Sequence, residues 1–217
     1  VAQAAGHLNV VVVGWNDSTA TVTSVTDAAG NAYTRAVGPT VRTGQASQAM
    51  YFTPNTVAGN SNSVTVSFSA AAAFPDIRIL EYSGLDPANP LDTVAATNVS
   101  SATSSSGALT TSVPKVLLVA ANIVGTTTSG PGPGFTSRMI TSPDGDIAED
   151  RVVTTAGSYS ATAPLSSSGY WVMQMVAFKA ATLPPDTTPP IVSITAPVAN
   201  ATVTSTISVT AAATDNI

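Results

Sequence analysis

The segment DIRILEYSGLDPANPLD, residues 76–92, decides how the rest of this sequence is interpreted. Branched and aromatic residues alternate along residues 77–82, which predicts a β-strand. Gly84, Pro87 and Pro90 follow it and end the strand in a turn-rich loop. We therefore expect residues 77–82 to form a central strand around which the other strands are stacked.

Three further segments are apolar at nearly every position, namely residues 8–15, 115–124 and 170–179. A strand that is apolar on both sides is buried on both faces. Shorter segments with strand character fill the remaining sequence, and the Ser/Thr-rich residues 97–112 are either an edge strand with a linker or a disordered loop. About ten to twelve strands without helical periodicity predict an all-β fold, a β-sandwich of jelly-roll or immunoglobulin-like type. The residues expected to be most buried are Val11, Val13, Val116, Leu118 and Val176.

The segment LPPDTTPP, residues 183–190, is the clearest domain boundary because its four prolines form a stiff, extended spacer. We expect a β-sandwich module over residues 1–183, a Pro-rich linker over 184–190, and a truncated immunoglobulin-like segment over 191–217. A complete immunoglobulin-like domain needs about 100 residues. The chain is therefore interpreted as one piece of a longer string of modules.

The composition excludes several classes of function. Charged residues make up 9% of the chain, against about 25% in typical globular proteins. The net charge of −5 and the lack of a basic patch argue against nucleic-acid binding. No apolar run approaches the roughly 20 residues of a membrane span, which argues against membrane insertion. Because the chain has no cysteine, thiol catalysis, cysteine-bound zinc and disulfides are excluded.

The segments SVTDAAGNAYT, LEYSGLDPANPLD, GFTSR, GDIAEDRVV and AGSYSAT resemble a repeat module of large secreted bacterial multidomain proteins. The segment DTTPPIVSITAPVANATV resembles the start of a bacterial immunoglobulin-like domain. The resemblance implies an extracellular or cell-surface location, with glycans or neighbouring protein modules as partners. It implies no particular activity.

Modules of this kind have one more strand before the segment that corresponds to residues 8–15. Only VAQAAGH precedes it here, so we expect the first sheet to lack its opening strand. An open sheet edge recruits another strand. Residues 191–195 and 207–213 are then expected to add to a sheet of a neighbouring copy by strand exchange. The alternative is a tail that packs nearby without exchange.

Two acidic segments are candidate calcium sites, because Ca²⁺ takes six to eight oxygen ligands. The first, PDGDIAED, contributes Asp144, Asp146, Glu149 and Asp150. In the alternative interpretation it is a solvated turn, with Glu149 or Asp150 paired to Arg138 or Arg151. The second segment, GLDPANPLD, contributes Asp86 and Asp92, and its alternative is local Asx-turn hydrogen bonding. The predicted cofactor is therefore structural Ca²⁺ or none.

Polysaccharide hydrolysis would require two carboxyl groups about 5–10 Å apart. Glu81 with Glu149 or Asp150 is the weak candidate pair. A Ser-His-Asp triad is disfavoured, because His7 is the only histidine and no G-x-S-x-G motif is present.

Three aromatic residues are candidates for stacking on sugar rings, namely Tyr82, Tyr170 and Trp171. Aromatic side chains at strand positions are more often part of the core. Because Tyr170 and Trp171 are adjacent, a strand points them to opposite faces, and one of them should be less buried. The leading prediction is a non-catalytic extracellular structural or adhesion module. The alternatives are a carbohydrate-binding accessory module and a polysaccharide hydrolase.

Overall fold

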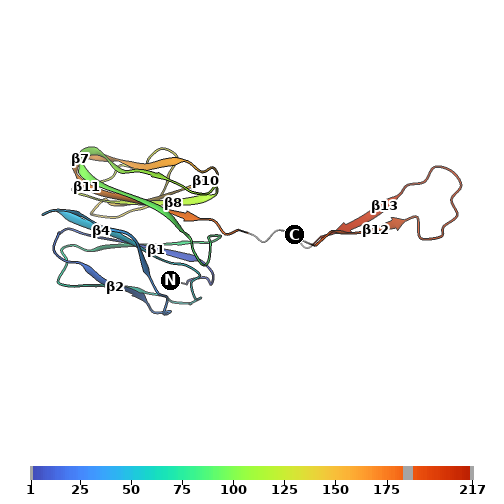
Figure 1. Ribbon diagram of the computed structural model, residues 1–217, viewed down its shortest axis with the longest axis horizontal. Coiled ribbons are helices and arrows are strands. Elements are labelled where there is room, and N and C mark those ends of the chain that lie inside the picture. The colour runs from blue at the N-terminus through green and yellow to red at the C-terminus, as the bar shows by residue number, and fades with distance from the viewer. Residues whose placement is uncertain (1, 183–187, 216–217) are drawn as a thin grey trace. The chain divides into compact units, whose positions relative to one another are not determined.

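The computed structural model describes residues 2–182 and 188–215 (Figure 1). The chain divides into two compact units, Val1–Ala181 and Thr182–Ile217, and each is considered by itself. The described residues form thirteen strands and no helix, so the predicted all-β class is confirmed. Residues 184–187 of the predicted linker lie outside the described residues.

The first sheet of the larger unit has four antiparallel strands in the order β3-β4-β1-β6. Its members are β1 (Leu8–Trp15), β3 (Thr34–Arg42), β4 (Ala46–Thr53) and β6 (Asp76–Tyr82). The prediction that residues 77–82 form a central strand is wrong, because β6 lies at the edge. The alternation of β6 leaves Ile77 and Ile79 40% and 44% exposed, whereas β1 is buried at every position.

The inner place beside β6 is taken by β1, which pairs with β4 along one side and with β6 along the other. Residues 8–15 are therefore not at an open edge of the first sheet. Val11, for example, lies opposite Tyr51 of β4 and Ile79 of β6.

The second sheet has five antiparallel strands in the order β7-β11-β8-β10-β9. Its members are β7 (Leu91–Thr110), β8 (Val116–Val124), β9 (Thr136–Ile140), β10 (Ile147–Val153) and β11 (Ser158–Lys179). The pairing of β7 with β11 shifts register between Pro164 and Gly169, which divides both long strands into two parts. Most of residues 97–112 belong to the edge strand β7, so this segment is not a disordered loop.

Apolar side chains fill three layers, which explains why three strands are apolar on both faces. The two sheets pack on each other through residues such as Val10, Val12, Leu117 and Val176. A pair formed by β2 (Val22–Asp27) and β5 (Val64–Phe68) covers the other face of β1 and β4 (Figure 1). On the far face of the five-stranded sheet, the first part of β11 contributes Ala161 and Ala163 to a third cluster with Leu118, Trp171 and Met173.

The predicted core is confirmed residue by residue. The five side chains expected to be most buried are all 0–1% exposed, namely Val11, Val13, Val116, Leu118 and Val176. Each lies on β1, β8 or the last part of β11. These are three of the five inner strands of the two sheets, and both of their faces are covered.

The smaller unit contains β12 (Ile191–Ala196) and β13 (Thr210–Thr214), which pair antiparallel with each other. The two strands expected to exchange with a neighbouring copy therefore already have one partner each. Ile191, Val192 and Ile194 are 73%, 63% and 66% exposed. Across residues 2–182 and 188–215, we find no helix with the length and apolar character needed to cross a membrane.

Candidate functional site

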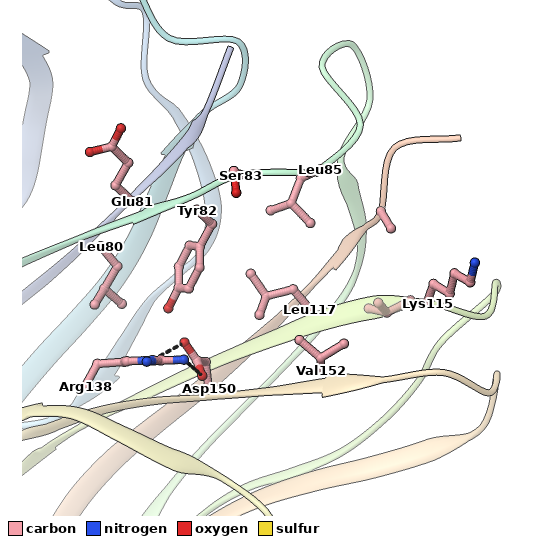
Figure 2. A pocket seen from close by; sticks show the side chains of 13 residues that line it. Leu80, Glu81, Tyr82, Ser83, Leu85, Lys115, Leu117, Arg138, Asp150 and Val152 are labelled. Atoms are coloured by element: carbon pink, nitrogen blue, oxygen red, sulfur yellow. Dashed lines mark hydrogen bonds and ion pairs between the residues drawn. The ribbon is translucent and has the colours of Figure 1, made fainter. Parts of the chain in front are cut away.

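A cleft of about 530 Å³ lies between the edge strand β6 and the five-stranded sheet (Figure 2). Its volume is in the range of small-molecule sites, roughly 300–1,000 Å³. The cleft forms because Leu80 and Tyr82 of β6 face the five-stranded sheet, where Leu117 and Asp150 line the opposite wall. The site therefore depends on how the two sheets stack.

The walls of the cleft are mainly apolar, with Leu80, Leu85, Leu117 and Val152 among the lining residues. Val152 is 71% exposed, which is unusual for a valine within a strand of a covered sheet. Lys115 lies at one end of the cleft and Arg138 at the other (Figure 2). The cleft thus offers an apolar surface between Lys115 and the Arg138–Asp150 ion pair.

The charged end of the cleft is an ion pair between Arg138 and Asp150. Nε and Nη2 of Arg138 donate to Oδ2 and Oδ1 of Asp150 at 2.6 Å and 2.9 Å. Asp150 is 3% exposed, and its hydrogen bond and charge raise the pKa of Arg138. The predicted pairing of an acid in this segment with Arg138 is confirmed, but the segment is not a solvated turn, because Asp146, Glu149 and Asp150 are buried. Bidentate contacts between arginine and a carboxylate are stronger than ion pairs that have a single hydrogen bond.

The hydroxyl group of Tyr82 points toward this ion pair (Figure 2). Burial raises the pKa of Tyr82, and the negative charge of Asp150 raises it further. Tyr82 therefore keeps its proton and can act as a hydrogen-bond donor in the cleft. Its ring is only partly buried, so it is the one predicted sugar-stacking residue that lines this site.

Glu149 lies on the opposite face of β10 from Asp150, because neighbouring strand residues point to opposite sides. It is 0% exposed, and Oε2 accepts a hydrogen bond of 2.9 Å from the backbone N–H of Gly132. Burial raises the pKa of the Glu149 carboxyl group to about 7. Glu149 and Asp150 thus belong to two separate environments and cannot serve one site.

Asp146 is 2% exposed and accepts a 2.8 Å hydrogen bond from the backbone N–H of Val124. Burial raises its pKa to about 7, although the nearby Arg78 guanidinium acts in the opposite direction. Its surroundings are a buried charge cluster between the sheets.

Arg78 is the cation of this cluster, a role that the sequence did not predict. It is 1% exposed, and Nη1 donates to the carbonyl groups of Asn122 and Ile147 at 2.8 Å and 2.7 Å. Nε lies 3.1 Å from Asp76 Oδ2. The alternation of strand residues could have indicated its burial, because it places Arg78 on the same strand face as Leu80 and Tyr82.

The remaining predicted calcium ligands are used locally or are exposed. Asp86 accepts backbone hydrogen bonds from Ala88 and Asn89 at 2.9 Å and 3.0 Å, which lower its pKa. This is the predicted Asx-turn alternative. Asp92 accepts hydrogen bonds from the backbone N–H and the hydroxyl group of Ser112, and Asp144 is exposed.

The structure therefore does not gather either acidic segment into one carboxylate cluster. Within residues 2–182 and 188–215, no group of three or more acidic, histidine or cysteine side chains is arranged to hold a metal ion.

Glu81 is exposed, and Oε1 accepts hydrogen bonds from His7 Nδ1 at 2.8 Å and the backbone N–H of Ala4 at 2.9 Å. Glu81 and Asp150 both line the cleft. However, the Glu81 side chain points away from Asp150 (Figure 2), and Asp150 is paired with Arg138. The two candidate acids do not face each other across a substrate space.

Trp171 cannot be a sugar-stacking platform, which corrects the prediction. It is 3% exposed within the cluster on the far face of the five-stranded sheet, and Nε1 donates to Ser101 Oγ at 2.9 Å. Tyr170 is partly buried, so the expectation that one of the two adjacent aromatics is less buried is confirmed. The Tyr170 ring packs against Gly125, where any larger residue would collide with it.

Comparison with known proteins gave no match to a family model, a curated protein or a solved structure.

Proposed function

We propose that this chain is a non-catalytic structural or adhesion module of a larger secreted or surface protein. The proposal rests mainly on the observation that the buried acidic side chains interact with other groups of the fold. Asp150 pairs with Arg138, Glu149 accepts from the backbone of Gly132, and Asp146 lies beside Arg78. Polysaccharide hydrolysis needs two carboxyl groups that are available to the substrate, and these three are engaged within the fold.

The proposed setting rests on composition and on the resemblance of the sequence segments. A low charged fraction of 9% leaves a surface rich in Ser, Thr, Ala and Gly, which is typical of secreted bacterial β-proteins. The two compact units, Val1–Ala181 and Thr182–Ile217, accord with a chain built from successive modules. Neighbouring modules or extracellular glycans are the proposed partners.

The two alternatives have less support from the geometry. A carbohydrate-binding module would have to rely on Tyr82 and Tyr170, since Trp171 is in the core. A hydrolase would require Glu81 and Asp150 to turn toward each other and Asp150 to leave Arg138. Strand exchange through the smaller unit would require β12 or β13 to add a second partner.

A glycan array combined with a polysaccharide hydrolysis panel tests this proposal. We expect neither hydrolysis nor specific glycan binding. Hydrolysis that is abolished by Glu81→Gln would overturn the non-catalytic assignment. Glycan binding that is lost in Tyr170→Ala, with an unchanged melting temperature, would establish the carbohydrate-binding alternative instead.

Strand exchange is tested by measuring molar mass in solution over a range of concentrations. The full chain is compared with a version that lacks residues 184–217. An oligomer formed only by the full chain would support exchange through the smaller unit. Monomers in both cases would leave the module without this mode of assembly.

A further inference from the structure

Unpaired edges are the part of a β-sheet that can recruit another strand. The four-stranded and five-stranded sheets of the larger unit end in four edge strands, β3, β6, β7 and β9. Natural proteins protect such edges with bulges, prolines, charges or covering segments. The four edges can therefore be compared by the protection that each one carries.

The β3 edge is protected in three ways. Its pairing with β4 shifts register twice, between Arg35 and Val37 and between Val37 and Thr40. Pro39 interrupts the strand, and proline cannot donate a backbone hydrogen bond. Arg42 of β3 also donates to Ser100 of β7 at 2.9 Å, which fixes the edge against the other sheet.

The edges of the five-stranded sheet are irregular as well. The pairing of β7 with β11 shifts register at three places, and the pairing of β9 with β10 shifts between Ala148 and Glu149. Bulges of this kind twist a strand and disturb the regular spacing of its outer backbone groups. Neither edge presents a regular template for a new strand.

The β6 edge lacks these protections. It pairs with β1 in an unbroken register from Leu8↔Tyr82 to Gly14↔Asp76, and it contains no proline. Among the described residues, β1 is its only strand partner. Of the four outer strands of these two sheets, within the residues that the structure describes, β6 alone pairs in an unbroken register.

The charged residues of β6 do not block the edge by pointing an unpaired charge at an incoming strand. Arg78 is 1% exposed and bonded to two backbone carbonyl groups. Glu81 is already engaged by His7 and by the backbone of Ala4. The side chains that remain accessible on β6 include the apolar Ile77 and Ile79, 40% and 44% exposed.

Space for side chains of an added strand exists on both sides of this edge. On one face, Ile77 and Ile79 offer partly exposed apolar surface. On the other face, the cleft of about 530 Å³ opens beside Leu80 and Tyr82, with Val152 on its opposite wall. A strand bound here would find apolar neighbours for both sets of its alternating side chains.

The chain itself forms such a pairing just beyond β6. Leu85 forms an antiparallel bridge with Ala180, and the N–H of Ala181 donates to the carbonyl group of Gly84 at 2.9 Å. The segment that follows β6 thus already receives a partner from the end of the five-stranded sheet. The open part of the edge is β6 itself, Asp76–Tyr82.

We propose that the β6 edge binds an extended peptide segment of a partner protein by strand addition. Backbone hydrogen bonds to β6 provide the affinity, and side chains placed on Ile77 and Ile79 and in the cleft provide the specificity. The segment it fits is uncharged, β-branched and about five to seven residues long, to match the seven residues of β6. This inference goes beyond the proposed structural role, because it specifies the strand to which a partner binds and the chemical character of the bound segment.

The test uses the full chain and a fluorescent peptide of alternating Thr and Val between terminal lysines, with binding followed by fluorescence anisotropy. A second peptide has the same sequence with an N-methyl group on every residue between the lysines. We expect the first peptide to bind and the second to bind at least about tenfold more weakly, because N-methylation removes the backbone donors. Equal binding of both peptides, or no binding of the first, would refute strand addition.

A pair of matched variants places the binding on β6. Ile79→Lys introduces a charge on the β6 edge, and Val41→Lys does the same on the β3 edge, where Val41 is 41% exposed. We expect Ile79→Lys to weaken binding about tenfold or more and Val41→Lys to leave it unchanged, with both melting curves close to that of the parent. Equal effects of the two variants would overturn the assignment to β6.

The same variants distinguish a partner peptide from a second copy of the chain. A dimer that forms with rising concentration and disappears in Ile79→Lys would show that β6 pairs with another copy, which would overturn the proposal of a partner segment. If Ile79→Lys does not fold, Ile77→Lys on the same strand replaces it, and the comparison of the two peptides needs no variant. The glycan and hydrolysis assays are independent of these readouts.

Discussion

Glu149 provides the most direct test of the structure, because its burial makes stability depend on pH in an unusual direction. Its side chain is 0% exposed, with Oε2 bound to the Gly132 N–H and Oε1 without a hydrogen-bond partner among the described residues. Burial raises the pKa of the carboxyl group from 4.5 to about 7. Between these two pH values the folded protein keeps a proton that the unfolded chain has released.

The free energy of unfolding therefore falls as pH rises through this range, because the folded state binds more protons than the unfolded state. A carboxylate with a lowered pKa would have the opposite effect. Raising the pKa from 4.5 to about 7 costs about 3 kcal/mol of stability above pH 7, at about 1.4 kcal/mol per pH unit. Below pH 4.5 this cost is absent.

The substitution Glu149→Gln isolates this contribution. Glutamine stays uncharged at every pH, and its carbonyl oxygen can still accept from the Gly132 N–H. We expect Glu149→Gln and the parent protein to have similar stability near pH 4.5. Above pH 7 the variant should be more stable by about 3 kcal/mol.

Urea unfolding measured at a series of pH values between 4 and 8 gives the required free energies. Asp146, whose pKa burial also raises to about 7, contributes the same pH dependence to both proteins, so their difference reports Glu149 alone. Glu81→Gln, which removes an exposed carboxylate, serves as the control. If the stability of Glu149→Gln falls with pH as steeply as that of the parent, Glu149 does not carry the buried proton and the reasoning is refuted.

Three further predictions concern the core, the buried cation and metal binding. Leu118 is 0% exposed, and Leu118→Ala should lower the free energy of unfolding in urea by about 2–5 kcal/mol. Ile140→Ala, at a position that is 41% exposed, should lower it by about 0.5 kcal/mol or less. A loss below about 1 kcal/mol for Leu118→Ala would contradict the inner position of β8. Arg78→Met should destabilise the protein by about 3–5 kcal/mol, because it leaves a buried charge cluster without its cation. Arg35 is exposed, so Arg35→Met should have little effect on stability. Similar losses of stability for the two variants would argue against the buried charge cluster. Addition of a chelator should leave the melting temperature unchanged, and a decrease that calcium reverses would establish a calcium site by mass action.

The sequence identified the inner strands of the fold correctly because local pattern encodes burial. Residues 8–15, 115–124 and 170–179 are apolar on both faces, and each corresponds to an inner strand that is covered on both sides. The alternation along residues 77–82 likewise predicted a strand, and β6 covers Asp76–Tyr82. Its position at the edge could not be predicted in the same way, since pairing partners are not part of a local pattern.

The candidate site was predicted only in part. The acidic segment PDGDIAED stands out in the sequence, and one of its acids pairs with Arg138, as one of the two interpretations predicts. The calcium interpretation of this segment expected its acids to lie together, whereas Asp146, Glu149 and Asp150 take different partners. The cleft beside β6 had no signal in the sequence, since β6, β8 and β10 supply its walls from distant parts of the chain.

The sequence by itself thus determined the all-β class and the five residues predicted for the core, because each follows from periodicity and composition over a few neighbouring residues. The tertiary structure alone decided which acids are buried, that Trp171 is in the core, that Arg78 lies between the sheets and that β6 has an open edge. These properties depend on contacts between residues far apart in the chain, such as the 44 positions between Arg78 and Asn122. The stacking of the sheets fixes such contacts, and no local pattern records them.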